Sequence, residues 1–337
     1  MDLFTPIVSE GEQHPNFRSI YKQGNKFNFD VVNDWASGFQ DRDGKFVKEF
    51  QTTFDSSFWE LYLFAVLKHF GLTVDFSASS PDFFVTNSGG MNVEATVALH
   101  AQGSVPEYMK RGTRVPDDLN ELNRQAILRI RNSIDAKQKK YSKVYSSLNH
   151  VKNRPFVLGI AAFDRPFARL ACQRAIEAVL CGYYVDEERF LREGGALQGQ
   201  HLSSVAKDNL SEVSVALFAR KEFAWLSAVI FSSCATWGKV RALSADPNPN
   251  ILFDAVRLNS SGAVPHVVSA KKSQYSESLL DGLRVYHNPL ATHKLSVETF
   301  RHTDVFQSYY SEEKEEWMHD QRDGLLLFRS VVTQIAR

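Results

Sequence analysis

Two carboxylates lie close together in the chain, within largely apolar segments where burial of a charged side chain costs free energy. Asp82 follows Pro81 at the start of the segment PDFFVTN, and Glu94 lies in the otherwise apolar segment MNVEATVAL. A Ser-Gly-Gly turn separates the two segments. A carboxylate that leaves water without a partner costs free energy, so the two side chains either face solvent or share a partner. A metal ion is the partner that best matches such a pair.

Two further polar residues interrupt apolar patterns. Glu60 is the one charged residue among the apolar side chains of 58–67. Lys137 continues a helical stripe formed by Ile134 and Tyr141, and so lies on the helix face that turns toward the sheet. A lysine at such a position is unusual in a purely structural role, which makes Lys137 a candidate for chemistry.

The elements that position these residues follow from periodicity and capping patterns. FDSSFWELYLFAVLKHFG predicts a buried helix, with N-cap chemistry from Asp55 to Ser57 and a glycine stop at Gly71. The segments LTVDFS, PDFFVTN and MNVEATVAL predict three strands. A long helix starts at Pro116-Asp117-Asp118, and the apolar segment RPFVLGIAAFD predicts a strand buried on both faces. The expected order is helix, three strands, helix, strand.

This order, with its three acids, resembles the PD-(D/E)xK nuclease superfamily, the restriction-endonuclease-like fold. The family has an acid on the first helix, a PD pair on the second strand and an ExK motif on the third. The matching residues are Glu60, Pro81-Asp82 and Glu94-Ala95-Thr96, and the resemblance covers about residues 50–165. It implies an α/β fold with a mixed central sheet flanked by helices, extended by further strands and helices toward the C-terminus.

The resemblance also implies a function. We expect hydrolysis of phosphodiester bonds in nucleic acid, with DNA favoured, and Mg²⁺ or Mn²⁺ as cofactor. Asp82, Glu94 and the carbonyl of Ala95 would bind the metal, and Glu60 would assist. Folds of this kind commonly serve bacterial defence, so another protein of a defence system is one expected partner. A homodimer is also expected, because two strands of a duplex need two active sites.

The third motif departs from the family pattern. Thr96 stands where the family has its catalytic lysine, and a hydroxyl does not supply a positive charge. Some relatives carry the basic residue on the following helix, and Lys137 is the candidate for that position. A second interpretation therefore stays open: a nuclease-like module without catalysis that binds nucleic acid or a protein. A third is an interaction protein whose acidic C-terminal helix binds a partner.

Three of the candidate residues, Glu60, Asp82 and Lys137, also have a structural explanation. Glu60 and Ser57 fit the S-x-x-E capping box, in which the glutamate returns to the N-cap amide. Asp82 can simply begin a strand after a turn. Lys137 can extend its stem along the helix edge and keep its ammonium in water.

The rest of the chain predicts one elaborated domain. Residues 1–50 form an N-terminal extension, 51–165 the nuclease-like core and 166–337 an elaboration of the same domain, because no Pro/Gly/Ser-rich linker divides the chain. In the last part, the pattern predicts a helix, several strands and a helical tail over about 311–335.

Composition narrows the classes of function. The net charge is zero, but 121–154 contains nine Lys or Arg against two acids, and 304–323 is acidic. The basic stretch can contact phosphates, although a solvated helix with interspersed lysines explains it equally well. Neither a glycine-rich phosphate loop nor a nucleophile elbow is present, which disfavours NTPases, dehydrogenases and serine hydrolases.

The chain also suggests where the protein resides. Three cysteines lack metal-binding spacing and are expected to be reduced core thiols. The longest apolar run, Leu61–Leu67, is too short to span a bilayer, and the N-terminal residues lack the layout of a signal peptide. We therefore expect a cytoplasmic protein without a membrane partner.

Overall fold

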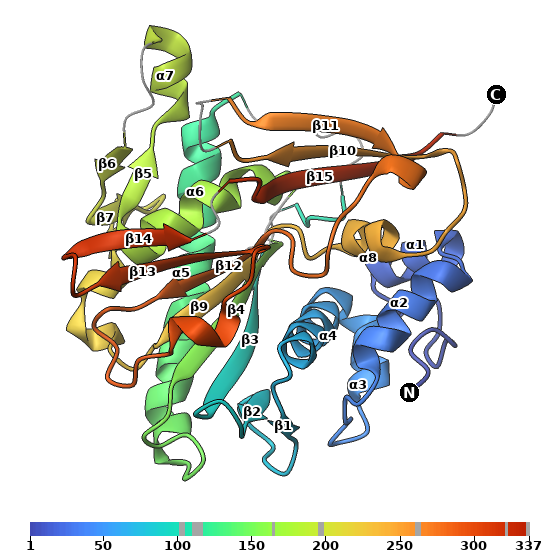
Figure 1. Ribbon diagram of the computed structural model, residues 1–337, viewed down its shortest axis with the longest axis horizontal. Helices are drawn as coiled ribbons and strands as arrows, with labels where there is room; N and C mark the ends of the chain where they lie inside the picture. Colours follow the sequence, from blue (N-terminus) through green and yellow to red (C-terminus); the bar gives the residue numbers. More distant parts are fainter. Residues whose placement is uncertain are drawn as a thin grey trace.

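A computed structural model describes residues 1–100, 105–109, 117–163, 166–194, 199–259, 264–320 and 323–334. These residues form a mixed α/β structure in which helices cover a large sheet (Figure 1). The α-helices are α1 (Pro15–Gln23), α2 (Lys26–Ala36), α3 (Phe46–Thr52), α4 (Phe54–His69), α5 (Leu119–Lys143), α6 (Ala168–Cys181), α7 (Glu187–Glu193) and α8 (Trp237–Leu243). The strands are β1 (Val74–Asp75), β2 (Phe83–Val85), β3 (Met91–Leu99), β4 (Phe156–Phe163), β5 (Tyr183–Val185), β6 (Gly199–His201), β7 (Ser204–Ala206), β8 (Glu212–Ser214), β9 (Ala228–Ser232), β10 (Ile251–Arg257), β11 (His266–Lys271), β12 (Leu283–His287), β13 (Val305–Ser311), β14 (Glu316–Asp320) and β15 (Leu326–Thr333).

The large sheet has the strand order β1-β2-β3-β4-β9-β12-β13-β14. Its strands are mixed in direction: β3, β4 and β9 run parallel to one another, whereas β1, β2 and β3 pair antiparallel. The expected α/β class with a large mixed sheet between helices is confirmed. Strands from the C-terminal part of the chain continue this sheet beyond β4, and β11-β10-β15 form a separate antiparallel sheet.

Helix α4 packs tightly on one face of the sheet. Its apolar residues are buried around the helix, as the sequence predicts, and the Trp59 indole N–H donates to the carbonyl of Gly159 on β4 at 3.0 Å. A Cβ at Gly159 would lie 2.4 Å from Leu63 Cδ1, so the missing side chain permits this close approach. The helix ends as predicted, with Gly71 at φ +64° and its amide bonded to the Lys68 carbonyl.

The predicted start of α4 is wrong. The helix begins at Phe54, and Thr53 at the N-cap makes no side-chain capping bond. Ser57 is therefore already inside the helix and buried, so Ser57 and Glu60 do not form a capping box. Asp55 instead accepts a hydrogen bond from Asn16 of α1 at 2.8 Å, because the N-terminal helices pack against this end of α4.

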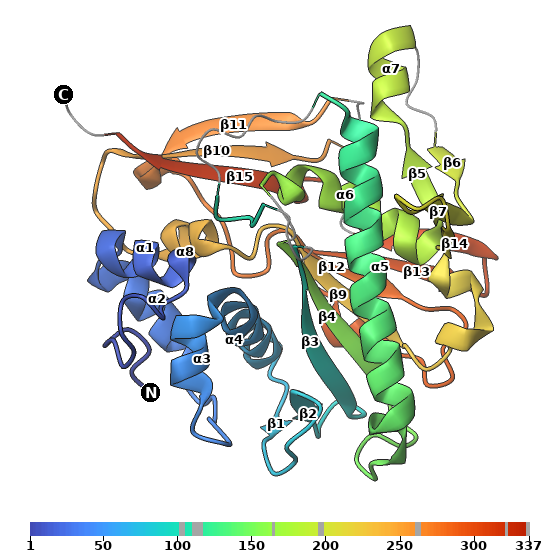
Figure 2. The same cartoon turned by 180° about the vertical axis from the view of Figure 1, so that it is seen from behind.

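Helix α5 covers the opposite face of the sheet, where it runs alongside β3 and β4 (Figure 2). It begins at Leu119, where the Asp118 side chain accepts from the amide of Glu121 at 2.6 Å. Pro116, expected at this start, lies outside the described residues. Alternate β4 residues serve the two faces: Val157 packs toward α4, and Leu158 toward α5.

The predicted helical tail is wrong. Residues 305–320 form the antiparallel pair β13–β14, in which Tyr310 lies opposite Trp317, and the chain then forms β15. Aromatic and β-branched residues flank the acidic turn and favour strands over a helix. The acidic segment is thus a hairpin at the sheet edge. Ile335, expected to end the tail, lies outside the described residues.

None of the described helices combines the length and apolar character needed to cross a membrane. Cys172, Cys181 and Cys234 form no disulfide with one another; Cys172 and Cys234 are buried and Cys181 is half-buried.

Candidate functional site

Glu94 is a buried acid on the sheet face that α5 covers. It lies in the first half of β3, in register with Leu158 of β4, whose side chain packs among residues of α5 and α6. Only 1% of the Glu94 side chain is exposed. The carboxylate therefore depends on protein partners for its charge.

Two lysines of α5 supply that charge. Lys137 Nζ lies 2.6 Å and Lys140 Nζ 3.1 Å from the same carboxylate oxygen, Glu94 Oε1. Burial alone would raise the pKa of Glu94, but the two ammonium groups and a hydrogen bond from Tyr145 outweigh burial and lower it. Glu94 is therefore ionised at neutral pH. The helix thus brings the predicted Lys137 to the predicted Glu94.

The other oxygen of Glu94 is held by a residue that the sequence patterns did not indicate. The hydroxyl of Tyr145, in the turn after α5, donates to Glu94 Oε2 at 2.8 Å, and Tyr145 is itself buried. The spacing of Lys137, Tyr141 and Tyr145 is four residues each, which marks one helix face. That spacing is the signal that could have identified Tyr145 in the sequence.

Asp82 lies at the start of β2, beside the middle of β3. Its Oδ2 accepts a hydrogen bond from the amide of Ala95 at 2.7 Å. Because the N–H and C=O of one strand residue point to the same neighbour, the Ala95 carbonyl lies on the Asp82 side of β3. Burial and repulsion from Glu94 raise the pKa of Asp82 to about 6. Asp82, Glu94 and Ala95 therefore form one electrostatic cluster.

Glu60 lies on α4 and interacts electrostatically with the cluster. It is half-buried, and burial together with repulsion from Asp82 raises its pKa to about 8, although Arg42 opposes the shift. Glu60 therefore carries a proton at neutral pH. The sensitivity of Glu60 to both Asp82 and Glu94 places the three predicted acids in one electrostatic neighbourhood.

Thr96 lies two residues beyond Glu94, and so on the same face of β3. It is half-buried, and its register partner on β4 is Ile160. Thr96 thus adds a hydroxyl to this face of β3, and the positive charge near Glu94 comes from Lys137 and Lys140 of α5.

The donor set matches a hard cation in its chemistry. Glu60, Asp82, Glu94 and the Ala95 carbonyl offer only oxygen, the donor that Mg²⁺ and Mn²⁺ prefer. Within the described residues, no group of three or more His, Cys, Asp or Glu side chains is arranged closely enough to hold an ion as it stands. Glu94 instead faces the ammonium groups of α5, and Asp82 accepts a hydrogen bond from the amide of Ala95. The chemical type of these donors therefore suits a hard cation, but the lysines at Glu94 and the amide at Asp82 would compete with a metal for the carboxylate oxygens.

The basic stretch of the sequence is only partly available for phosphates. Arg124 forms ion pairs with Glu121 and Asp208, and Arg131 pairs with Asp135 one helical turn away. The exposed lysines lie farther along, on the last turns of α5 and in the segment that follows: Lys139, Lys143 and Lys152. These lysines adjoin the end of α5 that contacts Glu94.

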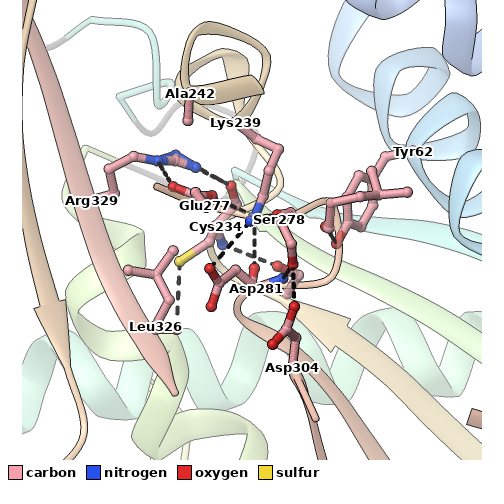
Figure 3. Close-up of polar contacts among 12 residues, drawn as sticks. Tyr62, Cys234, Lys239, Ala242, Glu277, Ser278, Asp281, Asp304, Leu326 and Arg329 are labelled. Atoms are coloured by element: carbon pink, nitrogen blue, oxygen red, sulfur yellow. Dashed lines mark hydrogen bonds and ion pairs between the residues drawn. The ribbon is translucent and has the colours of Figure 1, made fainter. Parts of the chain in front are cut away.

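A second charged cluster lies between α8, the segment before β12 and β15 (Figure 3). The buried ammonium of Lys239 donates to the carbonyls of Ser278 and Asp281 at 2.8 Å each, and it also pairs with Glu277. Arg329 Nε contacts the same carboxylate at 3.0 Å. All three N–H bonds of Lys239 are thus used, so this cluster joins elements rather than binding a ligand.

Two cavities of the described residues lie away from the acids. One, of about 520 Å³, is lined by α2, α4 and the segment after α8. The other, of about 360 Å³, lies among α1, α4, α8 and β15. Neither is lined by Glu60, Asp82, Glu94 or Lys137.

Comparison of the chain with models of known protein families, with curated proteins and with solved structures found no match in any of the three. The chemical interpretation of the site therefore depends on the geometry and charges of its own residues.

Proposed function

We propose that the protein is a metal-dependent nuclease that hydrolyses phosphodiester bonds in nucleic acid, with DNA as the favoured substrate. The observation that carries the proposal is the 2.6 Å contact between Lys137 Nζ and Glu94 Oε1, which joins residues 43 positions apart. The sequence offers Lys137 as a candidate replacement for the motif lysine, and this lysine lies beside Glu94.

Each residue has a role that its chemistry allows. Asp82, Glu94 and the Ala95 carbonyl would hold Mg²⁺ or Mn²⁺, with Glu60 as an additional oxygen donor. The cation would activate water and neutralise phosphate charge when bound. Lys137 would stabilise the negative charge that develops as the oxygen of water bonds to phosphorus. In that step one phosphorus–oxygen ester bond breaks, and the leaving oxygen takes up a proton.

The surroundings of the acids favour a polymer as substrate. Lys139, Lys143 and Lys152 are exposed near the same end of α5, where phosphates of a nucleic-acid backbone would be attracted. The acids line neither of the two cavities described above, whereas enzymes for small molecules usually place catalytic groups in such concave sites.

One observation favours a second candidate, a nuclease-like module that binds without cleaving. Both oxygens of Glu94 already have partners within the protein, namely Lys137 and Lys140 on one and Tyr145 on the other. A carboxylate so well compensated can serve a purely structural role. Thr96 in the motif is consistent with this alternative.

The decisive experiment is a cleavage assay on plasmid and single-stranded DNA with Mg²⁺ or Mn²⁺. We expect cleavage by the unaltered protein. Glu94→Gln and Asp82→Asn each remove a negative charge that would hold the cation, and Lys137→Met removes the positive charge that would stabilise the developing negative charge. Each variant should therefore lower cleavage by roughly 10²-fold or more. Lys271→Met is the control, since Lys271 is an exposed lysine of β11 with no role in the proposed site. It should retain cleavage within a few-fold of the unaltered protein.

The outcomes separate the two candidates. Cleavage that survives in Glu94→Gln and Asp82→Asn would come from another site or another protein, and would overturn the proposal. Salt-dependent DNA binding without cleavage under either metal would favour the binding module.

A further inference from the structure

The two lysines that face Glu94 are placed differently. Both ammonium groups lie against one oxygen, Glu94 Oε1, and both come from neighbouring turns of α5. Lys137 makes the shorter contact and only 20% of its side chain is exposed. Lys140 makes a 3.1 Å contact and 47% of its side chain is exposed. The pair therefore consists of an inner lysine and an outer lysine.

The charges of the cluster explain why two lysines are needed. Glu94 and Asp82 repel each other, and Lys137 and Lys140 both act against that repulsion. Two ammonium groups together carry the charge of one divalent cation. Their shared oxygen belongs to an acid proposed above to bind a metal. A lysine and a metal ion cannot both approach closely to the same oxygen without mutual repulsion.

The outer lysine is the one that can leave. Its flexible stem ends in partly exposed space, and its ammonium lies 4.8 Å from the centre of the Tyr145 ring, an attractive position that does not require Glu94. Tyr145 meanwhile keeps the other oxygen of Glu94 in place through its hydroxyl. Release of Lys140 would thus leave Glu94 oriented and Lys137 at the site.

We propose that Lys140 is a positioning residue that stands in for a divalent cation: it neutralises Glu94 in the metal-free protein and leaves Glu94 when Mg²⁺ or Mn²⁺ binds. This inference rests on the proposed function, because it assigns the two lysines separate tasks within that site. Lys137 stays beside Glu94 as the cation that serves the reaction. In the metal-free protein, Lys140 thereby balances the negative charge of Glu94.

The test is the affinity for Mn²⁺ alone, measured by calorimetric titration without nucleic acid. Removal of the competing ammonium in Lys140→Gln should tighten Mn²⁺ binding by roughly three- to fivefold, the upper part of the range expected for a partly exposed ion pair. Lys140→Arg keeps the charge and should bind within about twofold of the unaltered protein. Lys139→Gln is the matched control and should also stay within about twofold. Glu94→Gln should lose binding.

Each result bears on the proposal. Unchanged or weaker Mn²⁺ binding in Lys140→Gln, with cleavage by the unaltered protein intact, would overturn the role of Lys140 and leave the proposed function standing. Equal tightening in Lys139→Gln would also overturn it, since the effect would then be one of general charge. Absence of both Mn²⁺ binding and cleavage in the unaltered protein would overturn this inference together with the proposed function.

Discussion

At the scale of single residues, the three acids differ because their neighbours differ. Glu94 lies beside two ammonium groups and a hydroxyl, and its pKa is lowered. Asp82 has an amide hydrogen bond and a nearby like charge, and its pKa rises to about 6. For Glu60, burial dominates, and its pKa rises to about 8. One cluster thus holds acids that are ionised, partly protonated and mostly protonated at neutral pH.

The protonation of Glu60 predicts a dependence of stability on pH. The folded pKa lies above the ordinary value of 4.5, so the folded state holds the proton more tightly than the unfolded state. This contribution is fully present below about pH 4.5 and is lost as the pH rises toward about 8. Glu60→Gln keeps a neutral side chain at every pH. We expect it to match the unaltered protein at pH 5 and to be more stable at pH 9 by about 1 to 3 kcal/mol.

The measurement is chemical denaturation in the presence of a chelator, at both pH values. The difference between the two proteins removes the contributions of titrating groups that do not interact with Glu60. Equal stabilities at pH 9 would contradict the raised pKa.

At the scale of elements, two clusters of charged residues join secondary-structure elements, and they differ in their exposure to solvent. The contact between α5 and β3 is partly open to solvent on its lysine side, whereas the contact around Lys239 is closed (Figure 3). Lys239 and Glu277 are both 0% exposed, and Arg329 is 1% exposed. The closed cluster ties α8 and the segment before β12 to β15. Loss of one member leaves a buried charge without its partner.

The closed cluster predicts a large loss of stability on substitution. Lys239→Met should lower the free energy of unfolding by roughly 3–5 kcal/mol, because Glu277 then keeps a buried charge with less compensation. Lys271→Met, at the exposed end of β11, is the control and should change the stability by less than about 0.5 kcal/mol. Denaturant unfolding of both variants is the measurement. A loss below about 1 kcal/mol in Lys239→Met would show that the cluster is not a tie between elements.

Elements with local signals could be predicted from the sequence, and elements specified by distant partners could not. The glycine stop at Gly71 and the apolar run of β4 depend on residues within a few positions, and both were predicted. The strand β13 pairs with β12, and nothing within its own segment indicates that partner. The acidic turn between β13 and β14 suggested a solvated helix, although the flanking aromatic residues pair across strands.

The same distinction holds for the site. Glu60, Asp82 and Glu94 could be found because each interrupts an apolar or turn pattern, and Lys137 because it interrupts an apolar stripe. Tyr145 does not interrupt any pattern, since a tyrosine at a buried position is ordinary. Its role depends on how the turn after α5 meets β3, a contact between residues 51 positions apart.

At the scale of the whole molecule, the sheet of the first half of the chain is completed by strands from the second half. β4 is buried on both faces and also pairs with β9, which comes from beyond residue 166. At this junction the Ser227 amide donates to the Phe156 carbonyl at 2.8 Å, and the Phe156 amide donates to the Ser227 hydroxyl at 2.9 Å. Without the later strands, β4 would be a long apolar sheet edge.

A fragment of residues 1–163 should therefore fail to fold alone. We expect it to aggregate or to lack a cooperative unfolding transition, because the β4 edge and the apolar faces of the sheet would be exposed. Circular dichroism with denaturant titration, alongside the full chain, is the measurement. A soluble fragment with a cooperative transition would show that the C-terminal part is a separate unit.

The acidic hairpin and the basic end of α5 have a joint consequence. Four glutamates and one lysine occupy 312–316 at the β14 edge of the sheet, and β4, β9, β12 and β13 separate β14 from β3, beside which the exposed lysines of α5 lie. The two clusters place opposite local charges at separated positions along the sheet. A polyanion attracts the lysine cluster and repels the glutamate cluster, which favours approach with the lysines leading. A protein with zero net charge can thus still approach a polyanion in a preferred orientation.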